Sequence, residues 1–234
     1  PNSPFTGGAV LGDRVRMMRH ADDLKVFIRS MGARGHLGGL ALAAGNSAAV
    51  LDATGRDVVL LETVGVGQSE LEIADAADTT VVVVQPGSGD GVQAIKAGIM
   101  EIADIFVVNK ADHPQANRTV ANIRELLRMD IAPKKWIPPI VKTVAIENQG
   151  VEELWKRLEQ HREYLVSSGL LQARRKRRLE QQVLEIAERK LRRGMLYPRV
   201  HTAEFQSMLD ALVERRIDPY QVADTILPAI LAGK

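Results

Sequence analysis

The stretch IFVVNKAD, Ile105–Asp112, decides the fold and also suggests a chemistry. Its uninterrupted apolar start, without polar alternation, is typical of a parallel strand that is covered on both faces. Asn109, Lys110 and Asp112 follow where that strand should end. Ligands of open parallel sheets bind at the carboxyl ends of the strands. The stretch therefore predicts a buried strand that brings three polar side chains to a binding edge.

Further apolar runs rich in β-branched residues resemble this one, and segments with helical spacing of their apolar residues lie between them. The runs are Val58–Glu62, Thr79–Gln85 and the weaker Ile137–Val144, and the helical segments are Gly91–Ala103, Asn117–Arg128 and Val151–Leu165. Strands that alternate with helices predict an α/β fold with a mostly parallel, doubly wound sheet.

The polar loop after Val108 matches the hydrogen-bonding edge of guanine. The Asp112 carboxylate can accept from the N1–H and the 2-amino group together, whereas adenine lacks that amino group and offers an acceptor at N1. The stem of Lys110 can lie over the base, and Asn109 can brace the loop. The alternative is an ordinary strand-to-helix loop in which Asp112 caps the next helix. Taken alone, the loop leaves both interpretations open.

A second motif, LLETVG at Leu60–Gly65, strengthens the nucleotide interpretation. A carboxylate at a strand end, followed by a glycine, can hold Mg²⁺ directly or through water, while the glycine N–H meets a γ-phosphate. The alternative is a strand that happens to end in Glu62. Because this motif and the Asn109 loop occur in order, with room between them for two strand–helix units, together they predict a GTPase fold.

Two glycine-rich segments could complete such a site. GGAVLGD, Gly7–Asp13, lies where a switch loop would precede the Glu62 strand, and Asp13 is a second candidate contact for Mg²⁺ or its water. PGSGDGVQAIKAG, Pro86–Gly98, enters a helix after another strand. Its polar members are Asp90, Gln93 and Lys96. In both segments the alternative is that the aspartate simply caps a helix.

The character of the chain changes near Gly169, beyond which the sequence contains only helical patterns. We therefore divide the chain into a core over residues 1–168 and a helical arm over residues 169–234. Three helices are expected in the arm, and Asp218 and Pro219 mark the start of the last one. The arm either packs back on the sheet or buries its apolar stripes against another subunit. The basic run ARRKRR, Ala173–Arg178, is more typical of a solvated helix face than of a site for an acidic surface.

Composition excludes several classes of protein. The formal net charge is +2, so no overall field favours a nucleic-acid partner. There is no cysteine, and hence no disulfide framework or thiolate metal site. The five histidines are scattered without ligand spacing. No apolar run is long enough to span a membrane, and the first residues do not resemble a signal peptide, so we expect a cytoplasmic protein.

These segments together resemble the MeaB-type G proteins, which are GTPase chaperones of adenosylcobalamin-dependent acyl-CoA mutases, chiefly methylmalonyl-CoA mutase. The resemblance covers essentially the whole chain. It implies a P-loop-type GTPase core, GTP or GDP with Mg²⁺ as ligands, and a homodimer formed through the C-terminal helices. It also implies that the protein gates cobalamin delivery to the mutase and protects or reactivates that enzyme.

The resemblance assigns roles residue by residue. Guanine is bound by Asn109, Lys110, Asp112 and a backbone N–H of Ala145, and Mg²⁺ by Glu62 and Asp13. Gly65 lies near the γ-phosphate. Phe5–Arg16, Gly65–Glu70 and Ser88–Lys96 match three switch segments, the last of which includes Asp90, Gln93 and Lys96 and relays the nucleotide state to the mutase.

Two departures from the G-protein pattern matter. No G-x-x-x-x-G-K-[ST] motif occurs in the chain, although P-loop amides and lysine supply most of the phosphate binding. We therefore expect the chain to be part of a longer protein that carries the P-loop. Val66 stands where many signalling GTPases have a glutamine that orients water. It predicts slow intrinsic hydrolysis, with Gln68 as a weak substitute and no certain catalytic residue.

Three other functions remain to be weighed. A metal-insertion GTPase for nickel enzymes is disfavoured because the chain has no cysteine and no histidine-rich tract. A transport-associated nucleotide-binding protein that uses ATP is disfavoured by Asp112. A dimeric scaffold without enzymatic activity is the fourth interpretation for a chain that has no P-loop.

Overall fold

The computed structural model describes residues 17, 20, 22–31, 44–63, 76–87, 100–129, 135–196 and 202–231. By contacts between Cα atoms the chain divides into two compact units, Pro1–Arg175 and Lys176–Lys234. The elements of the first unit are α2 (Ala44–Ala53), β1 (Val81–Val84), α5 (Met100–Ile102), β2 (Ile105–Asn109), α6 (Ala116–Met129), β3 (Ile140–Thr143), the short 3-10 helix η4 (Ala145–Glu147) and α7 (Val151–Ser167). Helix α8 (Leu170–Leu191) begins in this unit and continues into the second.

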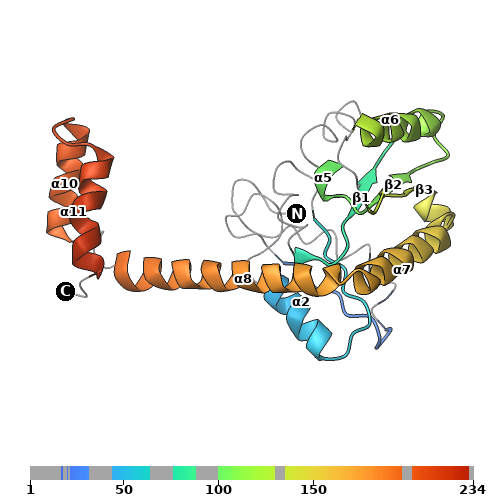
Figure 1. The fold of residues 1–234 in the computed structure, drawn as a ribbon, viewed down its shortest axis with the longest axis horizontal. Coiled ribbons are helices and arrows are strands. Elements are labelled where there is room, and N and C mark those ends of the chain that lie inside the picture. The colour runs from blue at the N-terminus through green and yellow to red at the C-terminus, as the bar shows by residue number, and fades with distance from the viewer. Residues whose placement is uncertain are drawn as a thin grey trace. The chain divides into compact units, whose positions relative to one another are not determined.

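The three strands form one parallel sheet in the order β1-β2-β3 (Figure 1). Val81 is paired with Ile105, and Phe106 with Ile140, so the strands run in register with their carboxyl ends at one edge. Strand β2 is central, and its first four residues are all buried. This burial on both faces is why the strand has no polar alternation.

Helices cover the two faces of the sheet (Figure 1). Phe106 and Val108 of β2 pack in a cluster with Val120 and Ile123 of α6, and both Phe106 and Ile123 are 0% exposed. The apolar residues of α6 recur every three or four positions, and this spacing places them on the face toward the strand. Helix α7, which contacts β2 and β3, buries Leu165 and His161. The site-bearing strand is thus held between two helices.

Most of the predicted elements are confirmed. The predicted strand Ile105–Asn109 is β2 residue for residue, and β1 and β3 lie within the predicted runs. Helices α6 and α7 match their predicted segments to within two residues. The described part of Gly91–Ala103 is α5, while the rest of that segment lies outside the described residues. The parallel α/β fold class is confirmed.

The prediction of a strand over Val58–Glu62 is wrong for the structure described. The segment has no regular secondary structure, and Leu60 is 86% exposed. An apolar run becomes a strand only when a neighbour supplies the backbone hydrogen bonds, and none of the described strands pairs with this segment. Helix α2 was not predicted, because its alanine-rich sequence has no apolar periodicity.

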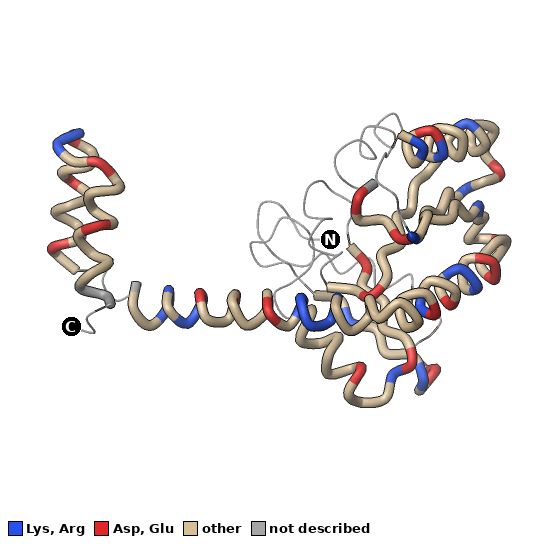
Figure 2. The backbone as a smooth tube through the Cα atoms, in the orientation of Figure 1, with Lys and Arg blue, Asp and Glu red and all other residues tan. Residues whose placement is uncertain are grey.

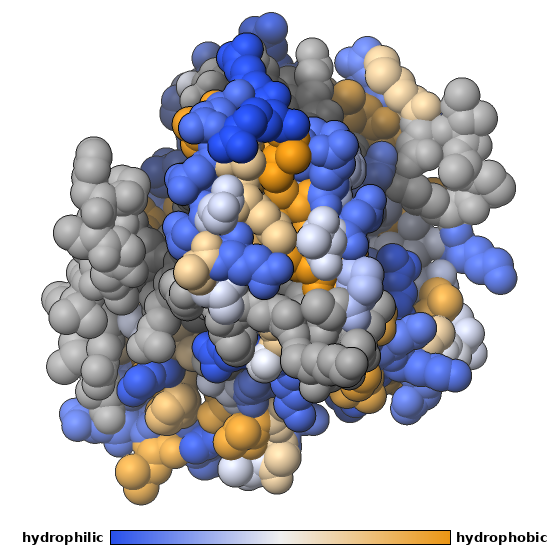
Figure 3. Space-filling model, turned by 90° about the vertical axis from the view of Figure 1, so that its left-hand side faces the viewer, coloured by the Kyte–Doolittle hydropathy of each residue, from blue (hydrophilic) through white to orange (hydrophobic). Residues whose placement is uncertain are grey.

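The regular elements among the described residues of the second unit are all helical. After α8, the π-helical turn η5 (Arg192–Leu196) is followed by α10 (Ala203–Val213) and α11 (Pro219–Leu231). The Asp218 side chain accepts a hydrogen bond from the N–H of Gln221 at 2.9 Å, which confirms the predicted start of the last helix. Seen from the side of α10 and α11, apolar side chains gather between polar ones (Figure 3). Among the described helices, none combines the length and the apolar character that a membrane span requires.

Candidate functional site

The predicted base-reading residues lie in a tight loop at the carboxyl end of β2. Asn109 is the last residue of the strand, and Lys110 follows with φ of 57°. The N–H of His113 donates to the carbonyl of Lys110 at 3.0 Å and closes the turn. The side chains of Lys110 and Asp112 are exposed. The loop therefore presents a cation and a carboxylate to solvent from a backbone that is itself fixed.

Asn109 ties this loop to the end of the neighbouring strand β3. Its Oδ1 accepts from the Thr143 hydroxyl at 3.0 Å and from the N–H of Ala145 at 3.2 Å. The N–H of Ala111 donates in turn to the Thr143 carbonyl at 3.0 Å. Because the Ala145 amide can only donate, this contact also fixes which end of the Asn109 amide faces β3. The Asn109 side-chain oxygen thus acts as a brace between the two strand ends.

The segment after β3 is a compact turn beside this brace. The N–H of Asn148 donates to the carbonyl of Ala145 at 3.2 Å, Asn148 has φ of 58°, and Val144 and Gln149 form an isolated antiparallel bridge. Gly150 then has φ of 76°, and a Cβ there would lie 2.1 Å from the Lys142 carbonyl oxygen. Ile146 projects from the turn and is 94% exposed. The turn is therefore rigid and presents an apolar side chain next to the base-reading loop.

The structure changes what can be expected of Ala145. The residue is exposed and adjacent to Asn109, as its predicted role requires, but its N–H already donates to Asn109. A base oxygen would have to share this N–H. Thr143, which sequence reasoning missed, belongs to the same arrangement. Its signal was its position as the last polar residue of the predicted strand beside the Asn109 strand.

The loop after β1 also approaches the base-reading loop. Gly87 has φ of 81°, and a Cβ on it would lie 3.3 Å from Cε1 of His113. The His113 ring is held by the N–H of Gln115, which donates to Nδ1 at 3.2 Å. The ends of all three described strands are therefore joined at one edge, the edge where open parallel sheets bind ligands.

The predicted phosphate and metal half of the site is only partly described. Glu62 is an exposed carboxylate in an irregular segment, and one hard oxygen ligand of this kind suits Mg²⁺ without defining a site. Within the described ranges, no group of three or more His, Asp or Glu residues could hold a metal ion. The other predicted members lie outside the described residues: Asp13, Gly65, Gln68, Asp90, Gln93 and Lys96.

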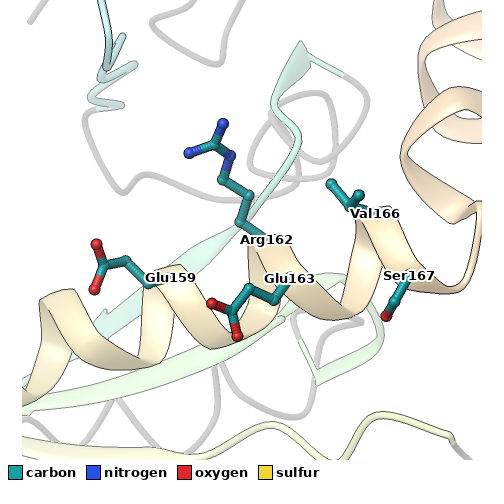
Figure 4. Close-up of a pocket in the computed structure, with 5 residues that line it drawn as sticks. All are labelled: Glu159, Arg162, Glu163, Val166 and Ser167. Atoms are coloured by element: carbon teal, nitrogen blue, oxygen red, sulfur yellow. The ribbon is translucent and has the colours of Figure 1, made fainter.

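A surface hollow elsewhere on the first unit does not compete with this edge as a site. It runs along α7 and is lined by residues of that helix alone (Figure 4). They are Glu159, Arg162, Glu163, Val166 and Ser167. Mixed charges on one helix face are typical of a solvated surface.

A parallel α/β sheet with an Asn-Lys-x-Asp loop at the end of its central strand defines the class of P-loop-type GTPase folds. The chain belongs to the MeaB family, because residues 1–197 match the family described as methylmalonyl Co-A mutase-associated GTPase MeaB. The family is one of GTPases, and the resemblance noted from the sequence is confirmed.

Relatives and a solved structure agree with this assignment. A protein of Pyrococcus abyssi that is named as a GTPase is 48% identical over 238 residues, which cover 100% of this chain and 72% of that protein. The mitochondrial methylmalonic aciduria type A homolog of Mus musculus is 33% identical over 179 residues, or 75% of this chain and 43% of that protein. The crystal structure of a LAO/AO transport system kinase superposes with a TM-score of 0.60 and 26% identity, covering 80% of this chain and 62% of that one. The chain thus spans less than half of the mouse relative and less than two thirds of the solved structure.

Proposed function

We propose that this chain carries the base-reading part of a GTPase that acts as a chaperone for a cobalamin-dependent acyl-CoA mutase, most simply methylmalonyl-CoA mutase. The observation that carries the proposal is the brace from Asn109 to Thr143 and Ala145, which fixes the loop holding Lys110 and Asp112. A rigid loop lets one exposed carboxylate discriminate between bases, because its position does not adapt to the wrong edge.

In this proposal the residues bind and position the nucleotide without covalent chemistry. Asp112 accepts from the guanine N1–H and 2-amino group, and the Lys110 stem covers one face of the base. Ile146, which is 94% exposed beside the same loop, offers an apolar surface to the nucleotide. Glu62 would hold Mg²⁺ with Asp13, and the metal would supply charge neutralisation at the phosphates. Gly65, Asp90, Gln93 and Lys96 keep their proposed phosphate and switch roles.

The P-loop is proposed to come from polypeptide outside this chain. Strand β1 pairs with β2 on one side, and no described strand pairs with its other edge. A further parallel strand carrying the P-loop would satisfy that edge, since unpaired strand edges readily recruit another strand. With Val66 in place of a glutamine, hydrolysis is proposed to be slow until the mutase binds.

The arm is proposed to form a homodimer. The described helices α8, α10 and α11 expose large apolar side chains, including Leu179 at 61%, Val183 at 64% and Val213 at 84%. Exposed apolar stripes on amphipathic helices are typical of surfaces that associate. The division into a core over residues 1–168 and an arm over residues 169–234 belongs to this proposal, as do a cytoplasmic location and the absence of nucleic-acid and membrane partners.

Nucleotide turnover by the full-length protein tests the proposal. We expect slow hydrolysis of GTP, no comparable hydrolysis of ATP, and faster GTP turnover when a methylmalonyl-CoA mutase is added. Equal turnover of ATP and GTP would contradict the GTPase assignment. If the rate of GTP turnover does not change when the mutase is added, and the two proteins do not bind each other, the chaperone assignment alone would be contradicted.

A transport-associated nucleotide-binding function is the second candidate, because the matching solved structure is named as a transport system kinase. The same assay distinguishes the two, since a kinase would transfer phosphate from ATP to an acceptor. Asp112 disfavours adenine on chemical grounds, and we therefore retain the guanine proposal.

A further inference from the structure

A buried carboxylate joins several elements at the amino ends of the strands, which lie opposite the carboxyl ends that carry the candidate nucleotide site. Asp104 directly precedes β2 and is 7% exposed. Its Oδ2 accepts from the N–H of Thr80 at 2.9 Å, and its backbone carbonyl accepts from Nε1 of Trp136 at 2.8 Å. Thr80 directly precedes β1, and Trp136 precedes β3. One residue thus connects the beginnings of all three strands.

His161 of α7 completes the buried part of this cluster. It is 0% exposed, its Nδ1 lies 2.8 Å from the Thr79 hydroxyl, and its Nε2 lies 3.2 Å from Oδ1 of Asp104. Trp136 packs against the imidazole with ring centroids 4.7 Å apart. Nδ1 and the Thr79 hydroxyl form a hydrogen bond, whereas Nε2 is buried beside the Asp104 carboxylate without the geometry of a hydrogen bond.

Two arginines of the first turns of α8 bind the outer side of the cluster. Arg174 donates to both carboxylate oxygens of Asp104, at 3.0 and 3.1 Å, and also to the carbonyl of Asp78 at 3.0 Å. Arg175 donates to Oδ2 of Asp78 at 2.7 Å. We call this pair of arginines with their two aspartates the clasp. Part of the basic run is thus used in directed ion pairs, in contrast to the solvated face that its sequence suggests.

The clasp and the inner cluster differ in how they are held. The side chains of Arg174 and Arg175 are 40% and 45% exposed, and α8 buries no residue along its length. The neighbouring helix α7, by contrast, buries His161 and Leu165. Charged groups alternate with other residues along both helices (Figure 2). The root of α8, the turns that carry Arg174 and Arg175, is therefore held by charge-assisted hydrogen bonds at a solvent-exposed surface. Salt weakens such bonds, whereas α7 is held by the burial of its side chains.

We propose that the clasp is a releasable joint, which lets the root of α8 leave the sheet while the core beneath it stays folded. Its two arginines are the last residues of the first compact unit, so the joint lies where the chain passes to the second. When the joint opens, the Asp104 carboxylate keeps the hydrogen bond from the Thr80 N–H and its contact with His161. In the closed joint, burial by itself would raise the pKa of Asp104, but His161, Arg174 and the N–H of Thr80 together lower it.

Distances between two spin labels test the joint directly. Because the chain has no cysteine, the double variant Gln172→Cys, Glu125→Cys carries labels only at the exposed root of α8 and on α6. The labelled protein is diluted into unlabelled protein, so that only distances within one chain are measured. In low salt we expect one narrow distance. Adding Arg174→Gln and Arg175→Gln should produce a second population, with the open-to-closed ratio raised about tenfold. High salt should act in the same direction.

The control is Arg177→Gln, which removes the same charge from an exposed arginine of the same helix. We expect it to leave the narrow distance unchanged. An unchanged distance in the Arg174, Arg175 double variant would contradict the clasp. A loss of the cooperative thermal unfolding transition in that variant would contradict release from an intact core. Neither outcome depends on nucleotide binding, so the test is independent of the proposed function.

Discussion

At the scale of single residues, the two ends of β2 carry different tasks. Asp104 at its start accepts from the N–H of Thr80, just before β1, while Asn109 at its end fixes a loop. In both tasks a side-chain oxygen accepts hydrogen bonds from the protein itself. The ligand-facing chemistry is left to Lys110 and Asp112, which are exposed. The position of this loop could be predicted from the sequence, because an apolar run ends in polar residues there. The partner of Asn109 could not, since it lies on another strand.

Gly150→Ala should destabilise the protein severely. The new Cβ would lie 2.1 Å from the Lys142 carbonyl oxygen, at a residue with φ of 76°. We expect a loss of roughly 3 kcal/mol or more in the free energy of unfolding, measured by urea denaturation. Gly169→Ala is the matched control, because its φ is 73° but no atom lies within 4 Å of the new Cβ. That change should cost only about 1 kcal/mol. Similar losses in both variants would show that the close contact is not what requires Gly150.

Thr143→Val should loosen the brace while preserving the shape of a residue that is 4% exposed. The variant removes the hydroxyl that donates to Asn109 at 3.0 Å. We expect a loss of about 1 kcal/mol in the free energy of unfolding, and faster amide hydrogen exchange at Ala145. Thr143→Ser keeps the donor and should keep slow exchange. If exchange at Ala145 is equal in all three proteins, the brace does not order this turn.

At the scale of elements, a strand is a property of a pair of segments, and this decides which predictions succeed. Burial on both faces marks β2 in the sequence, and β1 and β3 pair with it. Val58–Glu62 has the same composition but no described partner, so composition alone misleads there. Helix α6 could be predicted because its apolar residues define one face, whereas the alanine-rich α2 has no such pattern.

Asp104→Asn should lower stability at neutral pH, because it leaves Arg174 and His161 without the carboxylate. We expect a loss of about 3 kcal/mol in the free energy of unfolding. The pKa of Asp104 is lowered from its ordinary value of 3.8, so the ionised form stabilises the fold above that pH. This contribution is lost as the pH falls through the lower folded-state value.

The difference between wild type and Asp104→Asn should therefore be constant near neutral pH and should shrink in acid. Urea denaturation between neutral pH and the acid limit of folding measures it. Asp112→Asn is the control, since Asp112 is an exposed carboxylate and its loss should change stability little. A difference that grows in acid would contradict the assigned charge state of Asp104.

At the scale of the whole molecule, the sequence could indicate that a helical part follows the sheet, since strand patterns end before Gly169. It could not indicate how the two parts are joined. The compact units divide at Arg175, inside the continuous helix α8, and the clasp residues precede that division. Ion pairs between residues that are 70 and 97 positions apart leave no local pattern. The sequence of a basic run is the same whether its arginines face solvent or form ion pairs.

Truncation after Ser168 should give a monomer that retains the parallel sheet, if the arm forms the dimer. A second truncation, after Arg175, is a more specific test, because it also removes the second unit but keeps Arg174 and Arg175. We expect both to be monomers by light scattering, with the longer one more stable because Asp104 keeps Arg174. A dimer formed by either fragment would contradict the proposed role of the arm.

The central claim is that the loop over Asn109–Asp112 reads guanine, and competition for nucleotide by the full-length protein tests it most directly. A fluorescent guanine nucleotide is bound and then displaced by GDP, XDP or ADP, for wild type and for Asp112→Asn. We predict that GDP displaces it far better than ADP in the wild type, and that Asp112→Asn reverses the order of GDP and XDP, because the amide matches the xanthine edge. An unchanged preference for GDP over XDP in Asp112→Asn would contradict the claim.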